Sequence, residues 1–214
     1  MRIVVLRPEP GNAATRARIA EAGMAAVAMP LFAVTPLAWE APDPARFDSL
    51  LLTSANAVRH ARAALPTLAA LPTVVVGEAT AEAARAAGLN VVAVGGSDAD
   101  AARRELDRLG LARALHLCGR DHLLDPGGPI AAVIPVYASI ETTDRIDLSP
   151  GDLVLVHSPR AARRLAALVA DRAAIGVVAI SPRAAHAAGS GWRQVSIAAT
   201  PDDPALIAAA LAAH

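Results

Sequence analysis

The stretch VLVHSPRAA, residues 154–162, decides the fold, and the stretch VAISPRAA, residues 178–185, repeats it. Both copies place an apolar run just before Ser-Pro, and an alanine-rich segment follows. Serine is a favoured N-cap, and proline suits the first helical position because its fixed φ fits a helix and its missing N–H is not needed there. Each copy therefore predicts a buried strand whose carboxyl end leads into a helix.

Looser versions of this junction are LLLTSANA at residues 50–57 and VVVGEAT at residues 74–80. Further apolar runs, mostly continuous, alternate with alanine-rich segments, as expected for strands that are covered on both faces. We predict strands at residues 2–6, 25–29, 49–52, 73–76, 91–94, 114–117, 153–156, 177–180 and 195–198. We predict helices near residues 12–22, 55–65, 79–87, 99–109, 160–170, 183–188 and 203–213. This alternation predicts an α/β fold with parallel sheets flanked by helices.

Two non-helical stretches interrupt the alternation, near residues 30–46 and 135–150. The block between them has strands of its own, whereas the opening strand–helix–strand needs the strands of the last third of the sequence to complete a sheet. We therefore predict a discontinuous domain, residues 1–34 plus 143–214, and an inserted domain, residues 40–136. A double linker of this kind favours a cleft between the domains. A single open sheet with two long loops is the alternative.

Composition excludes several kinds of chemistry. The 214 residues carry no net charge, and all 20 basic residues are arginine. Without lysine the chain cannot form a lysine Schiff base or bind phosphate through a Walker lysine. A neutral chain also lacks the basic field that unspecific nucleic-acid binding requires. A single cysteine excludes an internal disulfide and any multi-cysteine metal site.

The opening of the sequence contains an apolar run of only four residues, 3–6. A secretory signal needs about 7–15 apolar residues and a membrane span about 20. We therefore expect a cytoplasmic protein without a membrane partner. We also expect a monomer whose partner is a small molecule and not a nucleic acid.

The predicted helix starts indicate an anion site. Free N–H groups at helix N-termini attract negative charge, and ligands of open α/β sheets bind at the carboxyl edge of the strands. Capping alone explains any single junction. For four junctions around one cleft, capping and the binding of a ligand with several carboxylates or phosphates remain equal alternatives. No GxGxxG or GxxxxGK[ST] motif follows a strand, so we expect neither a dinucleotide nor a nucleoside triphosphate.

Few side chains suit acid–base or metal chemistry. His116 and Cys118 could ligate a metal as a pair, but no second cluster completes a site, and we interpret them as alternating strand positions. We expect no metal and no cofactor. Tyr137 is the only tyrosine and lies in the second linker. Its phenol can donate a proton or a hydrogen bond at neutral pH; the alternative is a packed aromatic ring that anchors the linker.

Taken together, the junctions and the linker tyrosine resemble the uroporphyrinogen-III synthase family. The resemblance covers nearly the whole chain and rests on these segments in this order: Leu6-Arg7-Pro8, LTSANAV (52–58), VGEATA (76–81), Cys118-Gly119-Arg120, Val136-Tyr137, Ser158-Pro159-Arg160 and Ile180-Ser181-Pro182. It implies two α/β domains joined by a two-stranded linker. It also implies a cofactor-free lyase of heme biosynthesis. Such an enzyme closes hydroxymethylbilane, a linear tetrapyrrole with eight carboxylates, into uroporphyrinogen III with loss of water and inversion of ring D.

The resemblance assigns Tyr137 the catalytic role of assisting the departure of the substrate hydroxyl. It implies substrate-binding roles, often through backbone amides, for Arg7, Thr53, Ser54, Gly77, Thr80, Gly119, Arg120, Ser158 and Ser181. The chain departs from the family pattern at Asn56, Ser139, Arg183 and Ala184, which affects single contacts. The alternative function is a non-catalytic two-domain binding or regulatory paralogue that holds an anionic ligand in the interdomain cleft. A sugar-phosphate enzyme would need a cleft carboxylate or histidine that the sequence does not indicate.

Overall fold

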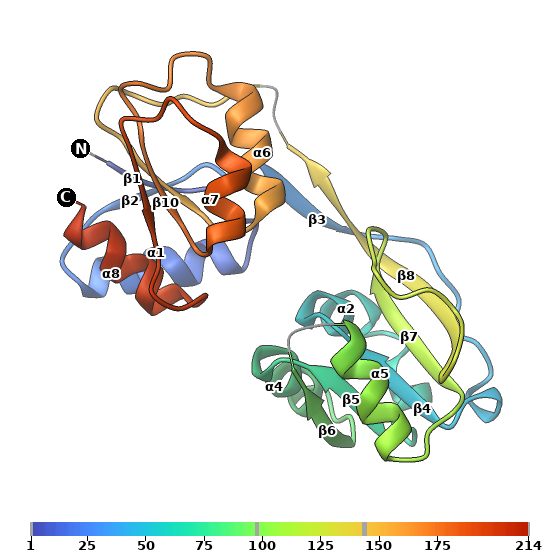
Figure 1. Ribbon diagram of the computed structural model, residues 1–214. Helices are drawn as coiled ribbons and strands as arrows, with labels where there is room; N and C mark the ends of the chain where they lie inside the picture. The colour runs from blue at the N-terminus through green and yellow to red at the C-terminus, as the bar shows by residue number, and fades with distance from the viewer. Residues whose placement is uncertain (1, 97–98, 143–144, 214) are drawn as a thin grey trace. The chain divides into compact units, whose positions relative to one another are not determined.

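The chain forms two compact units (Figure 1). The computed structural model describes these residues: 2–96, 99–142 and 145–213. The split unit consists of Met1–Ala33 together with Ile140–His214, and the inserted unit is Val34–Ser139. The predicted domain boundary at residue 143 lies outside the described residues. No helix in the described ranges is long and apolar enough to cross a membrane.

The split unit contains a parallel five-stranded sheet in the order β11-β10-β9-β1-β2. Its strands are β1 (Ile3–Val5), β2 (Ala26–Ala28), β9 (Leu153–Val156), β10 (Gly176–Ala179) and β11 (Gln194–Ile197). Its helices are α1 (Gly11–Glu21), α6 (Pro159–Leu168), α7 (Pro182–Ala188) and α8 (Asp203–Ala212). Helices α1 and α8 cover one face of the sheet, and α6 and α7 cover the other (Figure 1).

The apolar runs of this unit are buried on both sides of the sheet. Val4 and Val156 pack on the side of α6, whereas Ile3 and Leu155 pack with α1 and α8. Every residue of β9 and β10 is buried. Continuous rather than alternating apolar strands are what two covered faces require, so this prediction from the sequence is confirmed.

The inserted unit contains a six-stranded sheet in the order β3-β8-β7-β4-β5-β6. Its strands are β3 (Phe32–Pro36), β4 (Ser49–Leu52), β5 (Thr73–Val76), β6 (Val91–Gly95), β7 (Ala114–Gly119) and β8 (Ile130–Glu141). Its helices are the 3-10 helix η1 (Pro44–Arg46) and the α-helices α2 (Ala55–Ala61), α3 (Leu65–Leu68), α4 (Glu78–Ala86) and α5 (Ala99–Arg108). Helices α2, α3 and α4 pack on one face, and α5 packs on the other.

Strand β3 lies in the first stretch that the sequence analysis marked as non-helical, and β8 begins five residues before the second such stretch and extends into it. Pro36 ends β3, which is an edge strand, and Pro135 lies inside β8 near a register shift against β7. Proline cannot donate to a strand ladder and is tolerated at edges and irregularities. All nine predicted strands are present as well, with ends within two residues of the prediction.

The predicted helix at residues 55–65 is divided into α2 and α3. Pro66 lies in the first turn of α3. A proline inside a helix removes one backbone hydrogen bond and collides with the carbonyl four residues before it. The helix therefore ends at Ala61, and a new one begins at Leu65, where the missing N–H of Pro66 costs nothing.

Candidate functional site

Serine side chains cap three of the predicted junctions. Ser54, Ser158 and Ser181 accept hydrogen bonds from backbone N–H groups two or three residues later, at 3.2, 3.1 and 3.3 Å. Capping is therefore confirmed at these positions. Each hydroxyl still has its own hydrogen to donate, so a cap residue can also contact an anion.

Gly77 opens the fourth junction. Its φ of +79° lies in the left-handed region that glycine adopts without steric cost. Its N–H donates to the carbonyl of Gly95 at 3.3 Å, and Thr80 in the first turn of α4 is buried. Neither Gly77 nor Thr80 lines the pocket described next.

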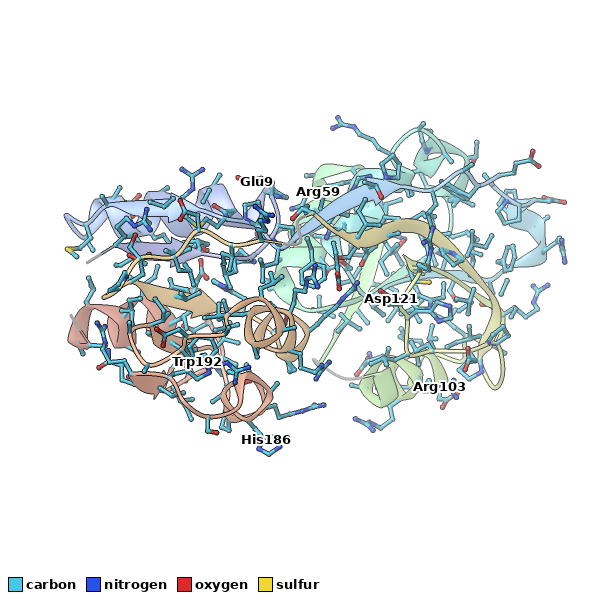
Figure 2. All side chains as sticks on the ribbon, turned by 90° about the horizontal axis from the view of Figure 1, so that it is seen from above. Glu9, Arg59, Arg103, Asp121, His186 and Trp192 are labelled. Atoms are coloured by element: carbon cyan, nitrogen blue, oxygen red, sulfur yellow. The ribbon has the colours of Figure 1, made fainter. Side chains whose placement is uncertain are left out.

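A pocket of about 230 Å³ lies at the carboxyl edge of the inserted unit's sheet. It brings together four of the predicted site residues: Thr53, Ser54, Gly119 and Tyr137. The remaining lining residues are Val76, His116, Cys118, Asp121, His122, Leu123 and Leu124. Figure 2 labels Asp121 on the loop after β7. A pocket of this size takes one arm or one ring of a large ligand, since sites for whole drug-sized molecules exceed about 300 Å³.

Tyr137 is held from two sides and is half-buried. It pairs with Gly119 across β7 and β8, and a Cβ built on Gly119 would lie 2.8 Å from the tyrosine Cζ. The His60 ring stacks on the tyrosine ring, with centroids 5.8 Å apart and planes at 30°. Within the described part of the chain the phenol hydroxyl has no hydrogen-bond partner. It is therefore free to donate to a ligand.

His116, which the sequence analysis interpreted as a strand position and not as a site residue, lines the pocket. It is 1% exposed, and its Nε2 lies 3.1 Å from Thr53 Oγ1. Burial, with a smaller contribution from His122, lowers the pKa of His116 to about 4, so the ring is neutral at pH 7. Burial also raises the pKa of Cys118 to about 12, so its thiol stays protonated. Cys118 is therefore not a nucleophile here.

The register of the sheet explains why His116 was missed. His116 pairs with Leu51 on β4, and Thr53 lies two residues further along the same face. In the sequence the two residues are 63 positions apart, with β5 and β6 between them. The available signal was a polar residue inside one apolar strand and another just after a neighbouring strand, but only the strand order shows that they meet.

A second polar cluster surrounds Asp203 in the split unit. The buried carboxylate accepts from Thr15 at 2.7 Å, Arg18 at 2.7 Å, His157 at 2.9 Å and Arg7 at 3.1 Å. Burial acts to raise the pKa of Asp203, but the hydrogen bonds from His157 and Thr15 and the charge of Arg7 outweigh it and hold the pKa well below its usual range. The cluster joins the start of α8 to β1, α1 and β9.

This cluster changes the interpretation of one predicted binding residue. Arg7 is paired with Asp203, and its side chain is 34% exposed. It also packs over Gly11, where an added Cβ would come too close to the guanidinium. By contrast, Arg120 is an exposed residue whose N–H donates to the carbonyl of Tyr137 at 2.8 Å. Arg7 therefore stabilises the fold through its ion pair with Asp203, and only part of its side chain is accessible to a ligand.

Ser158 and Ser181 lie next to a groove between α6 and α7. The groove has a volume of about 640 Å³ and is lined by Pro159, Arg163, Pro182, Arg183, His186 and Ala187. Arg163, Arg183 and His186 are exposed, and neither helix contains an acidic residue. Figure 2 shows His186 pointing away from α7 into solvent. The groove therefore presents positive charge next to two helix starts.

The described residues contain no group of three or more histidine, cysteine or acidic side chains that could hold an ion. The donor groups of the pocket are hydroxyls, ring nitrogens and backbone amides, which can bind carboxylates, and Asp121 adds one exposed carboxylate.

Comparison with known proteins finds one family model that matches most of the chain. The family model described as "Uroporphyrinogen-III synthase HemD" matches residues 13–208. No curated protein matches the chain.

Two solved structures show the same fold. Uroporphyrinogen-III synthetase from Helicobacter pylori is similar with a TM-score of 0.70 and 17% identity, and the match covers 100% of both chains. A mutant uroporphyrinogen III synthase from Thermus thermophilus has a TM-score of 0.53 and 17% identity, and the match covers 100% of this chain and 98% of that one. At this level of identity the two structures support the fold, and the family model supports the family.

Proposed function

The chain belongs to the uroporphyrinogen-III synthase family, and from this premise we propose how its residues perform the family reaction. The reaction is cofactor-independent. It closes hydroxymethylbilane into uroporphyrinogen III, with inversion of ring D and loss of water, in tetrapyrrole biosynthesis. Tyr137 carries the proposal, because its hydroxyl lies unpaired in the pocket of the inserted unit.

Tyr137 donates its proton to the hydroxyl of hydroxymethylbilane, which leaves as water. The electron pair of the adjacent pyrrole nitrogen completes an azafulvene, the electrophile that the last ring attacks. That ring passes through a spiro intermediate, breaks away and closes in the inverted orientation. The tyrosine recovers its proton when the macrocycle loses one to restore its aromatic rings, so no net proton is consumed.

The substrate carboxylates are bound by hydroxyls, backbone amides and arginines. In the inserted unit the binding residues are Thr53, Ser54, Gly77, Thr80, Gly119 and Arg120. In the split unit they are Arg7, Ser158 and Ser181. The cap geometry of the three serines supports these assignments, because each hydroxyl has a hydrogen to donate at the start of a helix. For Arg7 the support is its partial exposure beside Asp203.

Positioning supplies much of the catalysis. Free hydroxymethylbilane closes spontaneously to the uninverted isomer, so the enzyme must hold a folded conformer in which the inverted closure is faster. Fixing reacting groups in the correct geometry lowers the entropic barrier. The several binding groups named above serve that purpose.

We also propose that the protein acts as a monomer in the cytoplasm. The single cysteine gives no disulfide framework of a secreted protein, and zero net charge disfavours unspecific binding to nucleic acid. Light scattering across a hundredfold range of protein concentration should give a constant mass of one chain. A mass that doubles over this range would contradict the monomer.

The activity is tested with hydroxymethylbilane generated in situ. The products are oxidised, and the isomer I and isomer III porphyrins are separated. We expect mainly isomer III, in excess over a reaction without the protein. Isomer I alone, from a folded and monodisperse sample, would overturn the proposed function.

A further inference from the structure

The pocket of the inserted unit contains a hydrogen-bonded pair, Thr53 and His116, in which only one of the two ring nitrogens of the histidine has a partner. Thr53 Oγ1 and His116 Nε2 are 3.1 Å apart, whereas His116 Nδ1 is buried and has no hydrogen-bond partner in the described ranges. A buried polar atom without a partner is uncommon and costly. The lack of a partner for Nδ1 restricts which ring nitrogen bears the proton and where the threonine hydroxyl hydrogen points.

Two arrangements are possible for the neutral ring. If Nε2 accepts the hydrogen of Thr53, the ring proton lies on Nδ1, which leaves a buried N–H without an acceptor. If Nε2–H donates to Thr53 Oγ1, only a bare lone pair stays unpaired on Nδ1. Genuinely orphaned buried N–H groups are rare in proteins, and the second arrangement is favoured because it avoids one. The hydroxyl hydrogen of Thr53 then has no acceptor within the pair and can be donated to another group.

The surroundings of Thr53 decide where this hydrogen points. Its Oγ1 has one partner, His116, among the residues that the structure describes, and the residue lines the pocket. The pocket is therefore the remaining direction for the hydrogen. Asp121, the one carboxylate in the lining, is exposed, and solvent screens the charge of an exposed group.

We propose that His116 is a positioning residue: it holds the Thr53 hydroxyl as a hydrogen-bond donor toward one substrate carboxylate in this pocket. The inference rests on the proposed function and deepens it, because it assigns one arm of the substrate to the pocket. One lone pair of Thr53 Oγ1 accepts the Nε2–H of the ring, and the hydroxyl hydrogen stays available for an acceptor group of the substrate.

Two amide variants test the role of the ring nitrogen. In His116→Gln the side-chain amide reaches the position of Nε2 and can donate to Thr53, whereas in His116→Asn the amide is one bond shorter and cannot. We expect His116→Asn to raise KM for hydroxymethylbilane about tenfold, the effect of one misdirected hydrogen bond to a charged group. His116→Gln should rescue KM to within about threefold of the wild type. Equal KM values for the two variants, at equal melting temperatures, would overturn the proposal.

A double-mutant cycle separates positioning from a structural role. Thr53→Val alone should raise KM about tenfold, and adding His116→Asn to it should raise KM no further, because the histidine acts through the hydroxyl. Multiplicative effects would overturn the proposal. If the wild type makes no isomer III, the proposed function fails instead, so the two failures are distinguishable.

The tautomer has its own signature that does not depend on turnover. ¹⁵N chemical shifts of the histidine rings distinguish a protonated Nε2 from a protonated Nδ1, and the spectrum of His116→Gln identifies the lost pair of signals. We expect the Nε2–H form for His116 at pH 7. A protonated Nδ1 would contradict the proposal even if the KM values agreed with it.

Discussion

Gly119 shows how the absence of one side chain sets the position of another. An added Cβ would lie 2.8 Å from Tyr137 Cζ, closer than carbon atoms approach. We expect Gly119→Ala to displace the tyrosine ring and to lower kcat by about 100-fold, the usual contribution of a well-placed acid. Gly95→Ala is the matched control, because its nearest contact would be an ordinary 3.7 Å. Equal activity of the two variants would contradict the placement of the ring.

Tyr137→Phe removes the proton donor but keeps the ring against Gly119 and His60. General-acid groups contribute about 10²–10⁴-fold to rate, so we expect kcat for isomer III to fall at least about 100-fold. The melting temperature should stay within about 2 °C, because no hydrogen bond of the phenol is lost within the described residues. An unchanged kcat would remove the assigned role.

His116 gives the protein a sensitivity to mild acid. Its pKa is about 4 in the folded protein and about 6.5 in the unfolded chain. The unfolded state therefore binds the proton first as the pH falls, and the free energy of unfolding decreases between pH 6.5 and pH 4 by up to about 3 kcal/mol. Urea unfolding at several pH values measures this slope, and His116→Gln should flatten it. A slope of equal size in both proteins would refute the assignment.

At the level of elements, the Asp203 cluster fixes the start of α8 to β1, α1 and β9. Asp203→Asn leaves Arg7 and Arg18 without their carboxylate, and we expect it to lower the free energy of unfolding by about 2 kcal/mol at pH 7. The neighbouring change Asp202→Asn is the control, because asparagine replaces aspartate as an N-cap at little cost. Equal losses in the two variants would show that the cluster adds no stability.

Element positions followed from the sequence because burial on both faces produces continuous apolar runs, as in β9 and β10. Strand β8 did not follow, because its neighbour β3 lies almost a hundred residues earlier and Pro135 weakens the strand signal. The site residues also differ in whether the sequence alone predicts them. Tyr137 and Ser54 stand out by residue type and junction, whereas the Thr53–His116 and Arg7–Asp203 contacts depend on strand order and chain closure, which no local pattern encodes.

Across the whole molecule, zero net charge conceals an uneven distribution of arginine. Helices α6 and α7 carry arginines and no acids. We expect Arg183→Gln to raise KM for the polycarboxylate substrate about threefold at low salt, and we expect the effect to disappear near 0.5 M salt because ions screen exposed charges. Arg62→Gln, an exposed arginine of the inserted unit, is the control. The same KM change in both variants would show that the groove has no special part in binding.

β1 lies between β2 and β9 in the sheet, yet β9 is made about 150 residues later. On a ribosome that adds about 5–20 residues per second, β1 waits roughly 7–30 s for that neighbour. During the wait the inserted unit is complete in sequence and can fold, while one edge of β1 stays without a partner. During synthesis the inserted unit can therefore fold before the sheet of the split unit is complete. The strands made last, from β9 onward, complete the sheet that β1 and β2 begin.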